Sequence, residues 1–178
     1  EVVAYHVLAN SIMRHASVPV EITPLMLKQL PMTRERSPKQ STEFSFSRFL
    51  VPWLCNFQGQ ALFLDCDMLC RADIAELFKP MNKSVNVVKH NYQPRAEDKF
   101  LNQKQSVYEK KNWSSVMLFN CSWCPQLTPQ YVNIASGLEL HQFKWTSEPL
   151  IGELPIEWNH LVGEYEPNPN AKIAHFTL

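Results

Sequence analysis

The sequence predicts an α/β layered domain with a mostly parallel sheet. Segments with helical and strand-like patterns alternate along the chain, and the strand-like segments are continuous apolar runs instead of alternating ones. Continuous runs are typical of strands that helices cover on both faces, as in a parallel sheet. The 178 residues fit one domain, because no repeat, low-complexity tract or linker divides them.

The first predicted elements are a helix, a strand and a loop. Apolar residues recur at helical spacing from Val2 to Arg14, with no Pro or Gly between them, which predicts a helix. The stretch Val18–Leu25 is short, partly β-branched and bounded by prolines, and it predicts a buried strand. Residues 28–42 contain few apolar side chains and predict a surface loop. This loop carries four bases, Lys28, Arg34, Arg36 and Lys39.

A second helix is predicted over residues 41–57, capped by Ser41 or Thr42 and kinked at Pro52. The apolar run Ala61–Leu64 predicts a strand, and the segment that follows it predicts a short helix ending before Pro80. Three further strands are expected within residues 84–90, 114–120 and 171–178.

Composition excludes two classes of partner. Hydrophobic residues make up 45% of the chain, yet no apolar run approaches the roughly 18 residues that a membrane-spanning helix needs. Lys and Arg together number 17, as do Asp and Glu, so no overall positive field attracts nucleic acid.

Five scattered cysteines do not resemble the framework of a small secreted scaffold, so a reducing, cytoplasmic location is expected. Cys121 and Cys124 have the spacing of zinc ligands, but no second pair accompanies them, so we expect structural thiols. Sequons at Asn82, Asn112 and Asn120 would matter only in a secretory lumen, and no signal peptide is visible.

The stretch "ALFLDCDMLC" places Asp65 and Asp67 directly after an apolar run. Ligands of open α/β sheets bind at the carboxyl ends of strands, where Asp65 is expected to lie. Residues two apart in an extended chain point the same way, so both carboxylates can face one point while Cys66 turns into the protein. Two adjacent carboxylates repel unless a cation neutralises them, and oxygen ligands suit Mg²⁺ or Mn²⁺.

Three alternatives to this metal site stay open at the level of sequence. One carboxylate could cap the helix that begins near Asp73, although capping accounts for only one acid. A phosphohydrolase of the haloacid dehalogenase type would use Asp65 as nucleophile, but Leu69 stands where that class has Thr or Val, and its later acidic pair is missing. The third alternative is a non-catalytic module that binds sugars or nucleotides.

Residues 48–77, "RFLVPWLCNFQGQALFLDCDMLCRADIAEL", resemble the core of the family 8 glycosyltransferases and their bacterial and phage relatives, which have a GT-A fold. Three later segments resemble pieces of the same family in the same order: "SSVMLFN" (114–120), "LPIEWNHL" (154–161) and "KIAHF" (172–176). The resemblance implies one catalytic domain over residues 1–178. It also implies that the family's first strand, which carries much of the base pocket, precedes Glu1 and that a further segment follows Leu178.

The resemblance implies a retaining transferase that moves a sugar from a nucleotide donor, most simply a UDP-hexose, to a hydroxyl of a glycan, a lipid-linked sugar or another acceptor. Asp65, Asp67 and His175 would bind Mn²⁺ or Mg²⁺, and the His nitrogen favours Mn²⁺. The other implied roles are donor binding by Arg48, Asp65, Asn112 and Ser114, sugar contact by the catalytic Glu148, and acceptor contact by Trp158 and Asn159. The family commonly has Asn-Ala-Gly where this chain has Trp113, Ser114 and Ser115.

The chemistry of such a transfer agrees with this assignment. A nucleoside diphosphate leaves as a multiply charged anion, and a cation at the two aspartates would stabilise the developing charge. The four bases of residues 28–39 lead us to expect that this loop folds over the diphosphate.

Overall fold

The structure is a computed structural model of the whole chain, and it describes residues 2–35, 45–91, 98–99, 103–104 and 109–177. The helices are α1 (Val2–His15), α2 (Val51–Leu54), α3 (Pro129–Ile134) and α4 (Gly137–His141). The strands are β1 (Gln60–Leu64), β2 (Met68–Cys70), β3 (Val85–Val87), β4 (Asp98–Lys99), β5 (Gln103–Lys104), β6 (Val116–Asn120), β7 (Ile151–Glu153), β8 (His160–Leu161) and β9 (Ile173–His175). Seven 3₁₀ turns join them: η1 (Leu27–Gln29), η2 (Ser47–Leu50), η3 (Ile74–Leu77), η4 (Trp113–Ser115), η5 (Cys121–Trp123), η6 (Glu148–Leu150) and η7 (Ile156–Asn159).

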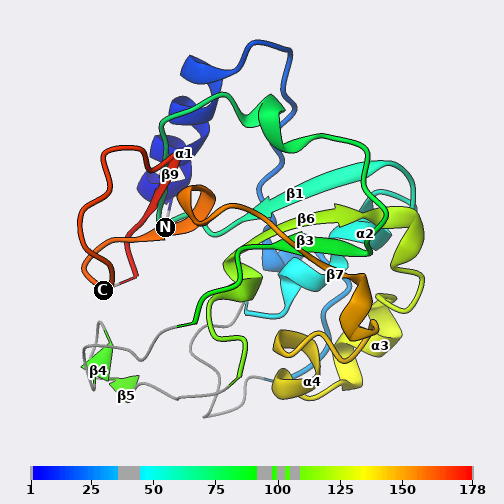
Figure 1. Cartoon of the computed structure of the whole chain (residues 1–178). Helices are drawn as coiled ribbons and strands as arrows, with labels where there is room; N and C mark the ends of the chain where they lie inside the picture. The colour runs from blue at the N-terminus through cyan, green and yellow to red at the C-terminus, as the bar shows by residue number, and fades with distance from the viewer. Residues whose placement is uncertain (1, 36–44, 92–97, 100–102, 105–108, 178) are drawn as a thin grey trace.

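A four-stranded sheet in the order β1-β6-β3-β7 forms the centre of the molecule (Figure 1). β1, β3 and β7 run in one direction, as the prediction of a mostly parallel sheet requires. β6 runs in the opposite direction between β1 and β3, so two of the three strand pairs are antiparallel. The strand directions therefore agree with the prediction, while the hydrogen-bonded pairs are mixed.

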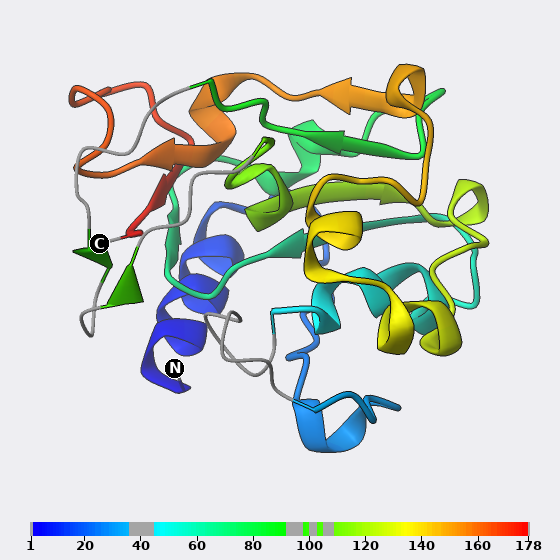
Figure 2. The same ribbon diagram turned by 90° about the horizontal axis from the view of Figure 1, so that it is seen from below.

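Successive side chains of the central strands face two different hydrophobic clusters. Phe119 and Met117 of β6 lie in the cluster that includes residues of α2, α3 and η2, whereas Val116 lies in the cluster that includes α1. Leu8 and Ile12 of α1 are buried in that second cluster. Figure 2 shows the strands in order from β7 to β1, with α2 and α3 beyond β1. Both faces of the sheet are therefore covered, as continuous apolar runs predict.

A second sheet has the strand order β2-β9-β8. Its strand β2 follows β1 of the first sheet after only three residues. β2 pairs with β9 in antiparallel register, so that Met68 lies opposite His175. β8 pairs with β9 in parallel register, so that Leu161 also lies opposite His175. The chain between β1 and β2, residues 65–67, is therefore the junction of the two sheets.

Most predicted elements are confirmed, and two are not. Residues 18–26 contain no strand; Pro19 and Pro24 cannot donate backbone hydrogen bonds, which removes two positions from any ladder. The predicted helix over residues 41–57 is represented by the short η2 and α2, and Pro52 lies in the first turn of α2 instead of kinking a long helix. The predicted caps Ser41 and Thr42 lie outside the described residues. The short helix before Pro80 is the 3₁₀ turn η3.

Within the described residues, no helix has the length and apolar character needed to cross a membrane.

Candidate active site

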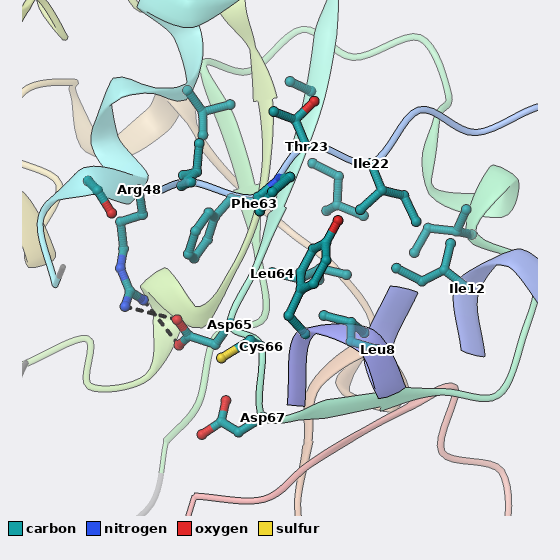
Figure 3. Close-up of a pocket in the computed structure, with 18 of the residues that line it drawn as sticks. Leu8, Ile12, Ile22, Thr23, Arg48, Phe63, Leu64, Asp65, Cys66 and Asp67 are labelled. Atoms are coloured by element: carbon teal, nitrogen blue, oxygen red, sulfur yellow. Dashed lines mark hydrogen bonds and ion pairs between the residues drawn. The ribbon is translucent and has the colours of Figure 1, made fainter. Parts of the chain in front are cut away.

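The two aspartates of the "ALFLDCDMLC" stretch lie at the junction between the sheets. Asp65 donates its backbone N–H to Ser115 O at 3.0 Å, which continues the β1–β6 ladder. Asp67 accepts a backbone hydrogen bond from Phe176 N at 2.9 Å, which ties it to the end of β9. The chain bends between these contacts, and Cys66 lines the same groove as both aspartates (Figure 3). The prediction that Cys66 turns into the protein was therefore wrong, because it assumed an extended chain.

His175 approaches Asp67 because β9 pairs with β2. The His175 Nε2 atom lies 3.3 Å from Asp67 Oδ1, and the histidine side chain is almost completely buried while Asp67 is half-exposed. Burial raises the pKa of Asp67, but the hydrogen bond and charge of His175, together with a backbone hydrogen bond and the charge of Arg48, lower it by more, so the net shift is downward. Asp67 is therefore held as a carboxylate facing a buried ring nitrogen.

Asp65 is bound by Arg48 on both carboxylate oxygens. Arg48 Nη1 donates to Oδ2 at 3.1 Å, and Nη2 lies 2.9 Å from Oδ1. Arg48 also donates through Nε to Ser45 O and through Nη1 to Ser114 O. Arg48 thus donates three hydrogen bonds to described protein atoms, and its Nη2 atom forms an ion pair with Asp65. Arg48, predicted to contact the donor, here fixes the orientation of Asp65.

Asp65, Asp67 and His175 form a set that fits a divalent cation. One ligand atom from each residue lies within 4.8 Å of the other two, and no other such group of His, Cys, Asp or Glu occurs in the described residues. The two carboxylates and the Arg48 guanidinium together carry a net charge of about −1. Two oxygen ligands and one nitrogen ligand suit Mn²⁺ better than Mg²⁺.

The capping alternative is satisfied by a different acid. Asp73 is the N-cap of η3, and its side chain accepts hydrogen bonds from Ala75 N at 3.0 Å and Ser17 N at 3.3 Å. A hydrogen bond from the Ser17 side chain, followed by the bonds from the backbone of Ala75 and of Ser17, lowers the pKa of Asp73. Asp65 and Asp67 therefore do not serve as the cap of this turn.

The aspartates open onto a groove of about 1960 Å³ between α1, residues 18–28 and β1. Figure 3 shows Leu8, Ile12 and Ile22 on one side of this groove and Arg48 and Phe63 on the other. Of the other predicted donor residues, Asn112 also lines it. Lys111 and Glu164, which sequence reasoning missed, are buried residues of the same lining. They come from loops, and nothing in their local sequence pattern marks them.

The basic loop is divided between two places. Lys28 lines the same groove as the aspartates, and its position over a diphosphate stays a prediction. Arg34 instead donates to Val132 O and Ala135 O and lies 3.9 Å from the centre of the Phe46 ring. It therefore holds the loop against α3 and faces away from the aspartates. Arg36 and Lys39 lie outside the described residues.

Two other predicted site residues, Ser114 and Glu148, do not contact the metal-ligand set. The Ser114 hydroxyl is buried and lies 2.7 Å from His141 Nδ1. Glu148 is 65% exposed and forms an ion pair with Lys110 Nζ at 2.5 Å; it is not among the residues that line the groove. The groove therefore brings neither side chain to the aspartates.

Trp158 and Asn159 are buried, which differs from the predicted contact with an acceptor. Trp158 is 3% exposed and packs in the cluster that contains α1. Asn159 is fully buried, with its side chain between His175 and Ser115. The Leu-Pro-x-x-Trp-Asn segment thus contacts the candidate metal ligand His175 through Asn159, on the ring nitrogen that faces away from Asp67.

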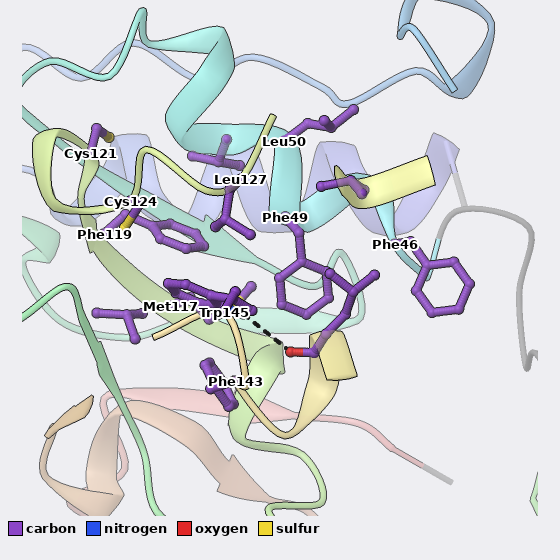
Figure 4. Packing of buried hydrophobic residues seen from close by; sticks show 14 of the residues in the cluster. Phe46, Phe49, Leu50, Met117, Phe119, Cys121, Cys124, Leu127, Phe143 and Trp145 are labelled. Atoms are coloured by element: carbon purple, nitrogen blue, oxygen red, sulfur yellow. Dashed lines mark hydrogen bonds between the residues drawn. The ribbon is translucent and has the colours of Figure 1, made fainter. Parts of the chain in front are cut away.

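The cysteine pair is part of the larger hydrophobic cluster (Figure 4). Burial, followed by the charge of neighbouring Cys55, raises the pKa of Cys121 to about 12; burial and Cys121 raise that of Cys124 to about 12. All five cysteines are free thiols, and Cys121 and Cys124 belong to no three-ligand group in the described part of the chain. The expectation of structural thiols agrees with this packing.

Comparison with known proteins gives the family. The sequence model described as "Glycosyl transferase family 8" matches residues 3–124. The chain is 42% identical over 190 residues to "Protein CDI" of Arabidopsis thaliana, an alignment that covers 99% of this chain and 73% of that protein.

Among solved structures, the apo form of the bifunctional glycosyltransferase WbbM has a TM-score of 0.61 at 14% identity. The superposition covers 98% of this chain and 43% of WbbM, so the chain spans less than half of that protein. This likeness confirms the predicted GT-A fold. The chain therefore belongs to glycosyl transferase family 8, which confirms the predicted glycosyltransferase class.

Proposed function

We propose that the protein is a metal-dependent glycosyltransferase that moves a sugar from a nucleoside diphosphate donor to an acceptor hydroxyl. The observation that carries this proposal is the set of Asp65, Asp67 and His175 at one end of a large groove. Family membership supports the reaction class, and the donor set supports the metal.

The two carboxylates have separate tasks in this proposal. Asp67 and His175 hold the cation, since neither side chain has another strong ionic partner in the described residues. Asp65 adds one oxygen while Arg48 keeps its carboxylate in place. When bound, the cation would act as a Lewis acid that stabilises the charge developing on the diphosphate leaving group.

Residues of the groove would bind the rest of the donor. Lys28 supplies a positive charge on the groove wall, and Asn112 supplies a polar side chain near the aspartates. The Arg48 guanidinium also lines the groove and suits a phosphate or sugar oxygen. We propose a UDP-hexose as donor, transfer with retention, and a glycan, lipid-linked sugar or other hydroxyl as acceptor. A cytoplasmic location also remains a prediction, and the implied sugar contact by Glu148, which does not line the groove, is left to a substitution test.

Family membership and the Arg48 contact disfavour the phosphohydrolase alternative. One oxygen of Asp65 accepts from the Arg48 guanidinium and the other lies 2.9 Å from it, which reduces the nucleophilicity that a phosphoenzyme would require. A non-catalytic binding module would use the same groove, and only turnover separates it from a transferase.

The test combines binding and turnover. Thermal stability is measured with UDP, GDP and their hexoses, with and without Mn²⁺, and release of nucleotide is then measured with and without simple glycoside acceptors. The proposal expects stabilisation by a nucleotide only when Mn²⁺ is present, followed by metal-dependent release. Binding without turnover would identify a binding module, and no metal-dependent effect of any nucleotide would refute the proposal.

A further inference from the structure

Asn159, the buried amide behind His175, has a complete set of hydrogen-bond partners that determines its orientation. Its Nδ2 atom lies 2.8 Å from Ser115 Oγ and 3.5 Å from Asn112 O. Its Oδ1 atom lies 2.8 Å from His175 Nδ1. All the side chains in this chain of contacts except that of Asn112 are at most 3% exposed, so water does not offer alternative partners.

Ser115 fixes which end of the amide faces it. The Ser115 hydroxyl lies 2.6 Å from Asn112 O, a carbonyl that can only accept, so the serine must donate its one proton there. Its oxygen is then left to accept, and the group that donates to it is the Asn159 NH₂. The same NH₂ also faces Asn112 O, a second acceptor. Turning the amide over would set acceptor against acceptor at both contacts.

The orientation of the amide in turn fixes the proton on His175. Because Asn159 presents its carbonyl oxygen, the Nδ1 atom of His175 must carry a hydrogen to donate to it. A neutral imidazole has only one N–H, so its Nε2 atom then carries a lone pair. Nε2 is the nitrogen that faces Asp67; the protonated ring donates from Nε2 to that carboxylate, and a cation at the site would take the place of this proton on the Nε2 lone pair.

We propose that Ser115 and Asn159 are positioning residues that hold His175 as the Nδ1–H tautomer, with the Nε2 lone pair directed at the cation site. This inference rests on the proposed metal site for its functional meaning, while the tautomer itself is a property of the metal-free protein. A ligating histidine whose other nitrogen is held by a hydrogen bond keeps both its tautomer and its ring orientation. Ser115 supplies one contact of this network with its own side chain.

The tautomer is tested directly by long-range ¹H–¹⁵N NMR of the metal-free, ¹⁵N-labelled protein at a pH where the imidazole is neutral. The His175 signals are assigned by their loss in His175→Gln. We expect the proton on Nδ1. A proton on Nε2 in the wild-type protein would overturn the inference, whether or not any metal binds.

The consequence for the metal is tested by titration with Mn²⁺ alone, followed by calorimetry or by the loss of the free Mn²⁺ EPR signal. Asn159→Leu removes the acceptor and is expected to weaken Mn²⁺ binding by about 10- to 100-fold. Ser115→Ala leaves the amide free to turn over; it is expected to produce a mixture of tautomers and to weaken binding by about tenfold.

The matched control is Ser84→Ala. Ser84 is also a buried serine, bonded to Trp123 O and to Thr146 Oγ1, but it lies beside Asn120 at the opposite end of β6. It is expected to bind Mn²⁺ as the wild type does. Wild-type affinity in Ser115→Ala together with a changed tautomer would refute the positioning role. An Nδ1–H tautomer in a wild-type protein that binds no Mn²⁺ would support the network and refute only the proposed metal site.

Discussion

The two sheets of the molecule are built from different kinds of contact. The four-stranded sheet is surrounded by apolar side chains, and Val85, Val87, Met117 and Phe119 are all 0% exposed. A buried polar chain runs from His175 of the three-stranded sheet through Asn159 to Ser115, which directly precedes β6. Apolar burial is non-directional and shared among many contacts, whereas a hydrogen-bonded chain depends on each member. We therefore expect the first sheet to determine stability and the second to determine activity.

The largest separation of stability from activity is expected for Asp67→Asn. Loss of one carboxylate from the cation site should lower kcat/KM by about 10³- to 10⁴-fold, or ~4 to 5.5 kcal/mol of transition-state stabilisation. The free energy of unfolding in EDTA should change by less than ~1 kcal/mol, because the Asp67 side chain is half-exposed. Donor turnover and denaturant unfolding measure the two quantities. Activity within tenfold of wild type would exclude Asp67 as a metal ligand.

Phe119→Ala tests the opposite case on the first sheet. Phe119 lies in the middle of the sheet on β6, packs against Trp145, and is fully buried, so truncation should cost about 3 to 5 kcal/mol of unfolding free energy. Mn²⁺ affinity of the folded protein should stay within about twofold of wild type, an estimate that assumes the two distant sites are independent.

Trp123→Ala is the control for Phe119→Ala, since this nearby aromatic side chain is 45% exposed and should cost less than ~1 kcal/mol. A large loss of Mn²⁺ affinity in Phe119→Ala would show that the two sheets are coupled.

The difference between the sheets also explains what the sequence could predict. Apolar spacing indicates the type of element directly, so the helix from Val2 and the strands at Ala61–Leu64 and within residues 114–120 were predicted close to their observed bounds. The two aspartates were placed correctly at a strand end, and the resemblance brought His175 to them. Residues 18–25 failed because an apolar, β-branched composition does not reveal whether a partner strand offers hydrogen bonds, and two prolines prevent it.

The parts of the site that the sequence did not reveal depend on side-chain direction. Arg48 was expected to face the donor, but a nearby carboxylate and two carbonyls engage most of its N–H groups. Asn159 was expected on the acceptor side, although the parallel pairing of β8 with β9 turns it toward His175. No local pattern encodes these directions, because they follow from contacts between segments up to 66 positions apart.

His90 predicts how the free energy of unfolding of the region around His175 depends on pH. It lies in the buried region near His175, with Nδ1 2.8 Å from the Tyr165 hydroxyl. Burial, and to a smaller extent the charge of His175, lower the pKa of His90 from 6.5 to about 3. Between these two values the unfolded chain binds a proton that the folded protein does not, so acidification favours unfolding.

His90 therefore does not lower the free energy of unfolding above pH 6.5, and it destabilises the folded protein increasingly as the pH falls toward 3. The slope should reach up to about 1.4 kcal/mol per pH unit. Unfolding free energies of wild type and His90→Gln, measured in denaturant from pH 7 to pH 4.5, isolate this slope from that of the carboxylates. Parallel curves for the two proteins would show that His90 titrates normally in the folded state.

Glu148→Gln is expected to have the smallest effect, and it tests a residue predicted to touch the transferred sugar. Glu148 is exposed and paired with Lys110, so the loss of this ion pair should change stability by less than ~1 kcal/mol. If the groove beside Asp67 holds the reacting groups, the turnover rate should change by less than about threefold, since a side chain outside that groove contributes no transition-state contact. Lys110→Gln breaks the same pair from the other side and should match it in both measurements. If Glu148→Gln alone instead slowed turnover by about two orders of magnitude or more, Glu148 would belong to the reaction, and η6 would have to move toward the aspartates when the donor binds.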